Sequence, residues 1–150
     1  MGYDAARASV ESRWLAQWTA DSTTLRTPTV FGDTSVWLTR VDGTLSTLFA
    51  PHMTAWVRVT IRFAASATAS LGPGILIRTP ARIWLQLFAP KKQGRGAVDG
   101  LADLAVPIFE QQQFDGLTCW ERQWMGEGDE EQWFTATLSI PFEFDEVAGG

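Results

Sequence analysis

The stretch "WFTATLSIPFEF" (Trp133–Phe144) decides the fold class, because apolar side chains occupy every second position along it. The apolar positions are Phe134, Ala136, Leu138, Ile140, Phe142 and Phe144. The positions between them include Trp133, Thr135, Thr137, Ser139 and Glu143. Successive side chains of a β-strand point to opposite faces of a sheet, so this pattern predicts a long strand with one buried face.

Two stretches upstream repeat the pattern and extend the predicted sheet. In "AWVRVTIRFA" (55–64), one face holds Val57, Val59, Ile61 and Phe63, and the other holds Trp56, Arg58, Thr60 and Arg62. In "ILIRTPARIWLQLFA" (75–89), Ile83, Leu85 and Leu87 lie opposite Arg82, Trp84, Gln86 and Phe88. We read this stretch as one long strand or a pair. Proline cannot donate a backbone hydrogen bond, so we expect Pro80 to force a bulge or an edge position there.

Two segments have the period of an amphipathic helix. Residues 4–18 place Val10, Trp14, Leu15 and Trp18 on one stripe, with Asp4 as a candidate N-cap. Residues 97–113 place Leu101, Leu104, Ala105, Ile108 and Phe109 at helical spacing. Pro107 lies inside this second segment, so we expect a kink or a late start.

The remaining segments complete a single predicted domain, 1–150, with its core at about 4–145 and a flexible tail at 146–150. The further predictions are short strands at Thr29–Phe31 and Ser35–Arg40, a loop at 41–54, a strand at 117–125 and a turn at 126–131. This order of elements predicts an α+β fold, in which two helices pack on a mainly antiparallel sheet.

The charge of the chain is unevenly distributed. The net charge is −5, but residues 1–109 carry eleven Lys/Arg against seven Asp/Glu, which is +4, and residues 110–150 carry Arg122 against ten Asp/Glu, which is −9. An acidic total argues against tight, non-specific DNA binding. The asymmetry favours a head-to-tail contact between copies. The alternative interpretation is that the acidic residues only solvate turns and the C-terminus.

The sequence contains no recognisable catalytic, cofactor or metal motif. The loop at 89–100, "APKKQGRGAVDG", resembles a phosphate-binding loop in being basic and rich in glycine. A Walker loop needs Lys directly after its second conserved glycine, but here Ala97 follows Gly96. His52 is the single histidine and Cys119 the single cysteine, which excludes the common zinc patterns. We expect Cys119 to be a buried, inert thiol. The chain is therefore expected to be no enzyme and to bind neither a metal nor a cofactor.

The sequence also shows no membrane-spanning segment and no secretion signal. The longest apolar runs are far shorter than the roughly 20 residues that span a bilayer, and "MGYDAARASV" has no apolar signal core. We expect no membrane partner and no secretion.

Eight tryptophans are an unusual number for a chain of 150 residues. Trp56, Trp84 and Trp133 fall on the strand face opposite the apolar one, together with Phe88. This predicts that the second face is covered too, either by the helices or by a neighbouring subunit. Tryptophan is enriched at protein interfaces. It is also typical of sugar-binding platforms, which is the main alternative.

The order of these features resembles the tail terminator (tail-completion) proteins of long-tailed bacteriophages and related gene-transfer particles. The stretches that carry the resemblance are "VESRWLAQW", "PHMTAWVRVTIRF", "ASLG", "RIWLQLFAPKKQGRGAVDGLADLAVPIF" and "WFTATLSIPFEFD". They span about residues 5 to 145, and none of them is a catalytic signature. Two departures are Pro80–Ala81, where the family pattern has a glycine, and the longer segment 19–54.

The resemblance implies a structural protein of the virion, assembled in the host cytoplasm. It implies that copies form a ring, usually a hexamer, at the head-proximal end of a finished tail tube. The ring stops tube polymerisation and meets both the tail tube protein and the head-tail connector protein, while DNA passes through without specific binding. The alternative function is a small-ligand or carbohydrate-binding domain that uses tryptophan platforms.

The candidate contact residues follow from the strand faces and the charges. We expect the subunit or partner interface to use Trp56, Arg58, Arg62, Lys91, Lys92 and Arg95. The acidic segment Glu127, Asp129, Glu130 and Glu131 is the candidate complementary patch or lumen rim.

Overall fold

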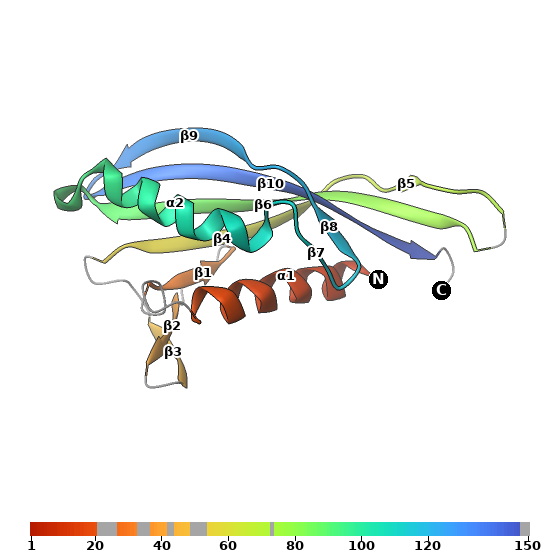
Figure 1. Ribbon diagram of the computed structural model, residues 1–150, viewed down its shortest axis with the longest axis horizontal. Coiled ribbons are helices and arrows are strands. Elements are labelled where there is room, and N and C mark those ends of the chain that lie inside the picture. The colour runs from red at the N-terminus through yellow and green to blue at the C-terminus, as the bar shows by residue number, and fades with distance from the viewer. Residues whose placement is uncertain (21–26, 33–36, 42–43, 49–53, 73, 148–150) are drawn as a thin grey trace.

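The computed structural model describes residues 1–20, 27–32, 37–41, 44–48, 54–72 and 74–147. Within these ranges the chain forms two α-helices and one ten-stranded sheet (Figure 1). The helices are α1 (Tyr3–Trp18) and α2 (Arg95–Phe109), and a 3-10 turn, η1 (Lys91–Gln93), precedes α2. The strands are β1 (Thr29–Phe31), β2 (Trp37–Val41), β3 (Thr44–Leu48), β4 (Trp56–Phe63), β5 (Ala67–Thr68), β6 (Leu76–Pro90), β7 (Gln113–Phe114), β8 (Leu117–Cys119), β9 (Gln123–Glu130) and β10 (Trp133–Val147).

The predicted α+β class with a mainly antiparallel sheet is confirmed. The strand order is β3-β2-β1-β4-β6-β10-β8-β7, and β5 and β9 pair with β6 and β10 respectively. All described pairs are antiparallel except β1 with β4. The centre of the sheet is β6, which runs antiparallel to β4 on one side and to β10 on the other.

Both helices pack on the same face of the sheet, as Figure 1 shows. This face presents the apolar positions predicted for β4, β6 and β10, and it forms one core with both helices. Trp14 and Trp18 are fully buried there, and the Trp14 indole Nε1 donates a hydrogen bond of 2.9 Å to Thr29 Oγ1. Burying each large apolar side chain contributes about 1.5–3 kcal/mol, so this seam holds the helices to the sheet.

The predicted helix ends were partly wrong. Gly2, and not Asp4, is the N-cap of α1, and no side chain caps the helix. The second helix starts at Arg95 and ends at Phe109, so the late start expected from Pro107 does not occur. Pro107 lies in the last turn instead.

Three predicted loop or tail segments contain strand. The loop predicted at 41–54 holds the β2–β3 hairpin, with β3 at Thr44–Leu48, although 42–43 and 49–53 lie outside the described residues. The turn predicted at 126–131 is wrong, because β9 continues to Glu130 along β10 and the turn itself consists of Glu131 and Gln132. The tail predicted at 146–150 is wrong at its first two residues, since β10 extends to Val147, and 148–150 lie outside the described residues.

Neither alternative predicted for Pro80, a bulge or an edge position, is correct, because Pro80 lies in the central strand β6. The register between β6 and β10 runs unbroken from Leu76 to Pro90. The carbonyl oxygen of Pro80 accepts a 2.9 Å hydrogen bond from the Ala64 amide, on the β4 side. The N and O atoms of one residue in an antiparallel strand point to the same side, so the nitrogen of Pro80 also faces the segment that connects β4 to β5. The missing N–H of Pro80 therefore removes no hydrogen bond between β6 and β10.

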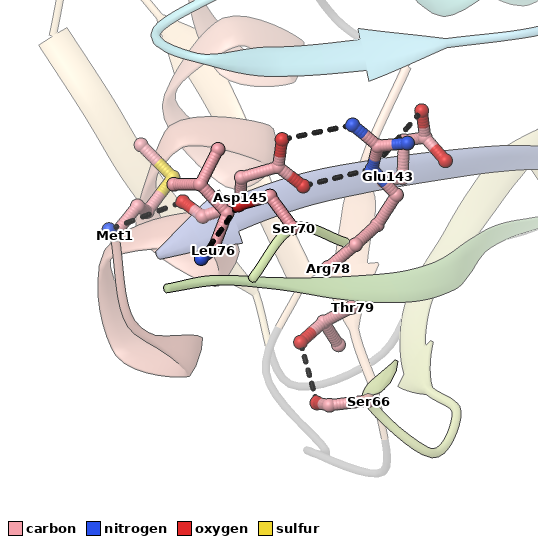
Figure 2. Close-up of polar contacts among 8 residues, drawn as sticks. All are labelled: Met1, Ser66, Ser70, Leu76, Arg78, Thr79, Glu143 and Asp145. Atoms are coloured by element: carbon pink, nitrogen blue, oxygen red, sulfur yellow. Dashed lines mark hydrogen bonds and ion pairs between the residues drawn. The ribbon is translucent and has the colours of Figure 1, made fainter. Parts of the chain in front are cut away.

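The far ends of β6 and β10 run on beyond the helices as a two-stranded arm with short β5 alongside (Figure 1). Figure 2 shows the polar contacts of this arm. The Arg78 guanidinium donates two hydrogen bonds to the Asp145 carboxylate, of 2.9 and 3.0 Å, and its Nε lies 3.8 Å from Glu143. The hydroxyls of Ser66 and buried Thr79 lie 2.6 Å apart.

Candidate functional site

The second face of the central strands carries the candidate site. We call it the open face, because both described helices lie on the other side of the sheet. Its members on β4, β6 and β10 are Trp56, Arg58, Thr60, Arg62, Arg82, Trp84, Gln86, Phe88, Trp133, Thr135, Thr137 and Ser139. The sequence predicted that either the helices or a neighbouring subunit covers this face, and the two described helices do not cover it.

Aromatic rings fill the end of the open face near β1 and β2. This tryptophan cluster consists of Val30, Trp37, Trp56, Phe88 and Trp133. Trp56 and Phe88 stack with ring centroids 3.8 Å apart, and Trp37 and Trp133 meet Trp56 edge-on at 5.5 and 6.2 Å. The exposed fraction of Trp56 is only 7% and that of Phe88 is 3%. The cluster is therefore a second small core on the side without helices.

Four buried donors on or beside this face have no hydrogen-bond partner among the described residues. They are Trp37 Nε1, Trp56 Nε1, Arg58 Nε and Trp84 Nε1. Leaving a buried donor unsatisfied costs about 1–3 kcal/mol, so native proteins keep few of them. All four belong to one surface and all four are donors. An acceptor from outside this chain would satisfy them.

Three guanidinium groups line the same face. Arg62 and Arg82 lie directly opposite each other in the β4–β6 register, which places like charges side by side. Arg58 lies over the Trp56 ring at 5.6 Å, and Arg82 donates hydrogen bonds to the neutral oxygens of Gln123 and Ser139 at 2.6 and 3.0 Å. None of the three arginines forms an ion pair with a described carboxylate, in contrast to Arg78, Arg95 and Arg122.

A shallow hollow of about 340 Å³ opens between these side chains. We call it the arginine hollow, and its lining is Arg58, Thr60, Arg62, Trp84, Gln86 and Thr137. The lining contains two cations, two hydroxyls, an amide and an indole N–H, but no carboxylate. Because guanidinium groups recognise carboxylate and phosphate oxygens, the hollow is suited to an anionic group.

The predicted basic loop and acidic segment meet within one chain. Arg95 Nη2 lies 2.8 Å from Asp129 Oδ1, and Arg95 Nη1 lies 3.8 Å from Glu127 Oε2. The Arg95 guanidinium also covers the Phe134 ring at 4.5 Å, and Lys91 Nζ lies 5.9 Å from the same ring. These contacts are on the helix side of the sheet. Part of the charge asymmetry is therefore neutralised inside the molecule.

Glu130 and Glu131 lie apart from these contacts. The register pairs Glu130 with Trp133, which places Glu130 on the open face. Both glutamates border a second hollow of about 620 Å³ beside the tryptophan cluster. Both are exposed, and no described cation pairs with either.

The structure adds residues to the predicted site and places others elsewhere. Trp56, Arg58 and Arg62 lie together on the open face as predicted, whereas Lys91, Lys92 and Arg95 lie at the start of α2. Arg82, Trp84 and Gln86 also belong to the open face, and the alternation on β6 had placed them there. They were not among the predicted contact residues, although the same signal that selected Trp56 and Arg58 on β4 applies to them.

The other reactive groups form no second site. Cys119 is 2% exposed, and its burial raises the pKa of its thiol to about 12, which keeps it protonated and inert. His52 lies outside the described residues. In the part of the chain that the structure describes, no group of three or more His, Cys, Asp or Glu side chains could hold a metal ion. Neither described helix is long and apolar enough to cross a membrane.

Comparison with known proteins identifies the fold but not a family. No protein-family model and no curated protein matches the chain. A solved structure matches it with a TM-score of 0.64 and 17% sequence identity, over 96% of both chains. At that identity the likeness shows a shared fold alone, and the name of that protein says nothing about its function.

Proposed function

We propose that the protein is a structural, non-enzymatic subunit that assembles with copies of itself into a ring. The observation that carries this proposal is the open face, where four buried donors and three arginines find no hydrogen-bond acceptor or carboxylate, respectively, among the described residues. A surface of this kind is costly to leave bare, since unsatisfied donors and adjacent like charges both destabilise the free chain. Assembly would satisfy both.

The place of this ring in a virion comes from the sequence resemblance to tail terminator proteins. On that basis the ring, a hexamer, caps the head-proximal end of a tail tube, stops tube polymerisation and presents a surface to the head-tail connector. The net charge of −5 supports passage of DNA without tight binding, because like charges repel.

The composition of the open face supports a protein partner. Trp and Arg are the residues most enriched at energetic centres of protein interfaces. Here three aromatic rings contact Trp56, and the Arg58 guanidinium lies over the same indole. Alternating aromatic anchors and guanidinium groups give such an interface both apolar contact area and directed hydrogen bonds.

The experiment is a measurement of assembly with and without tail tubes. Sedimentation velocity over a range of protein concentrations gives the oligomeric mass, and electron microscopy of tail tubes mixed with the protein shows whether tube ends are capped. The double variant Thr60→Glu, Thr137→Glu adds bulk and negative charge to the arginine hollow, and Asp103→Arg changes an exposed helix residue as the control. We expect wild type and the control to assemble and the double variant to fail. A wild-type protein that stays monomeric and also ignores tail tubes would refute the proposal.

Carbohydrate binding is the second candidate, favoured by the 620 Å³ hollow between the tryptophan cluster, Glu130 and Glu131. Sugars are recognised by aromatic faces next to carboxylates and amides. However, one face of Trp56 is occupied by Phe88 and the other is approached by Arg58, so this ring offers no bare platform. Titration with oligosaccharides, followed by tryptophan fluorescence, separates the candidates: a saturable shift supports sugar binding, and a flat response removes it.

A further inference from the structure

We infer that the arginine hollow is a carboxylate-binding site that receives the acidic hairpin tip of a second copy of this chain. We define the acidic tip as Glu130 and Glu131, where β9 turns into β10. The inference rests on the proposed function and names the two surfaces that meet.

The chemistry of the hollow selects an anion with several oxygen acceptors. Arg58 Nε and Trp84 Nε1 are buried, unpartnered donors that both belong to its lining. Arg62 adds an exposed guanidinium, and Thr60 and Thr137 add hydroxyls. A carboxylate accepts hydrogen bonds at both oxygens and pairs with a guanidinium in a bidentate geometry. One carboxylate therefore matches the donors for which the described part of the chain provides no acceptor.

The acidic tip supplies the matching charge. The four acidic residues of this hairpin divide into two pairs: Glu127 and Asp129 contact Arg95 on the helix side, while Glu130 and Glu131 contact no described cation. Glu131 has a backbone φ of 44°, a left-handed conformation that favours glycine. A left-handed backbone at a non-glycine residue is strained, and a contact made by the Glu131 carboxylate would explain why a glutamate is kept there.

The acidic tip of the same chain lies beside the arginine hollow but does not line it. Glu130 and Glu131 border the neighbouring hollow of about 620 Å³, which shares Arg58 and Gln86 with the arginine hollow but does not include Arg62 or Trp84. Arg62 is on β4, three strand spacings from β9, which is about 14 Å. The hydrogen-bonded sheet prevents the tip from folding back. The occupant must therefore come from another molecule, which produces a head-to-tail contact of the kind that closes rings.

Disulfide trapping tests this contact directly. One chain carries Arg62→Cys and the other carries Glu131→Cys, and the mixture is oxidised mildly. The native Cys119 is buried and does not compete. The control mixtures are Asp4→Cys with Glu131→Cys, and Arg62→Cys with Asp103→Cys; Asp4 and Asp103 are exposed residues of α1 and α2. We expect a covalent heterodimer at several times the control yield, and a yield equal to the controls would overturn the inference.

Charge reversal tests the pairing by a second route. Arg62→Glu and Glu131→Arg should each reduce assembly about tenfold or more when alone, because each creates a like-charge contact at every interface. An equal mixture of the two variants should recover assembly, since each reversed hollow can then take a reversed tip and each unchanged hollow an unchanged tip. Arg7→Glu on α1 and Asp103→Arg on α2, with the same changes of charge at exposed positions elsewhere, should leave assembly unchanged.

The outcomes separate this inference from the proposed function. If wild type assembles or caps tail tubes but the mixed variants do not recover, the pairing is wrong and the assembly role stands. If wild type neither assembles nor caps tubes, the assembly role fails as well. If Arg62→Glu leaves assembly intact but abolishes binding to a DNA duplex, the hollow serves phosphates and the inference is overturned.

Discussion

The indole of Trp56 and the phenyl ring of Phe88 lie face to face, with centroids 3.8 Å apart and planes within 1° of parallel. The two residues are directly paired in the β4–β6 register, so the stack is built into the sheet. Cross-strand aromatic pairs of this kind stabilise a sheet and hold both rings in place. The stack therefore gives the open face a rigid anchor before any partner binds.

Phe88→Ala should lower the free energy of unfolding by about 3 kcal/mol, because it removes a buried ring and leaves a cavity against Trp56. Urea unfolding followed by tryptophan fluorescence measures this loss. Leu104→Ala is the control: Leu104 is 40% exposed on α2, and its truncation should change stability by about 0.5 kcal/mol or less. Equal effects of the two substitutions would show that the tryptophan cluster is not a core.

Two glycine-to-alanine substitutions should have opposite signs. A Cβ at Gly128 would lie 2.9 Å from Thr135 Oγ1, and Thr135 is buried, so Gly128→Ala should destabilise the β9–β10 pair by about 1–3 kcal/mol. Gly100 lies inside α2 with open space around it, so Gly100→Ala should stabilise by about 0.5–1 kcal/mol through helix propensity. Thermal unfolding compares the two. A stable Gly128→Ala would argue against the described β9 register.

The Arg78–Asp145 pair should make the arm sensitive to acid. The hydrogen bonds from Arg78 lower the pKa of Asp145 below its ordinary value of 3.8. A lowered pKa in the folded state means that the contribution to stability is present above about pH 4 and is lost as the pH falls through the lower, folded pKa. The difference in stability between wild type and Asp145→Asn should therefore shrink below pH 4. Unfolding curves at several pH values test this, with Lys92→Gln as a charge-removal control that should show no such change.

Cys119 should not react with a thiol reagent in the folded protein at pH 8, because burial raises its pKa to about 12 and excludes the reagent. Unfolding in guanidinium chloride should release one reactive thiol per chain. The Arg62→Cys variant is the positive control, because Arg62 is exposed and a cysteine there should react at once. Rapid reaction of the native thiol would contradict the buried position of β8.

The elements that could be predicted are those with a local signal. The period of two in Trp133–Phe144 and the helical stripe of Val10, Trp14 and Trp18 are both read within one segment, and the structure confirms each. The acidic run at 127–131 was assigned to a turn from its composition. Its pairing with β10 depends on hydrogen bonds to a distant strand, which composition does not report.

The site was predicted in part for the same reason. Alternation on β4 placed Trp56, Arg58 and Arg62 on one face, but the contact of Arg95 with Asp129 joins residues far apart in the sequence. Charge totals for the two parts of the chain cannot reveal that contact. The unpartnered donors Trp84 Nε1 and Arg58 Nε also depend on what surrounds them in three dimensions, so no sequence pattern predicts them.

The position of Pro80 explains how a central strand keeps a residue that lacks an amide. Pro80 belongs to β6, which has partners on both sides, so the proline lies at no free edge. Its carbonyl accepts from the Ala64 amide where the chain crosses from β4 to β5, and its register with Glu143 of β10 is unbroken. The ladder between β6 and β10 therefore continues through the proline, and the long arm is a direct extension of the sheet.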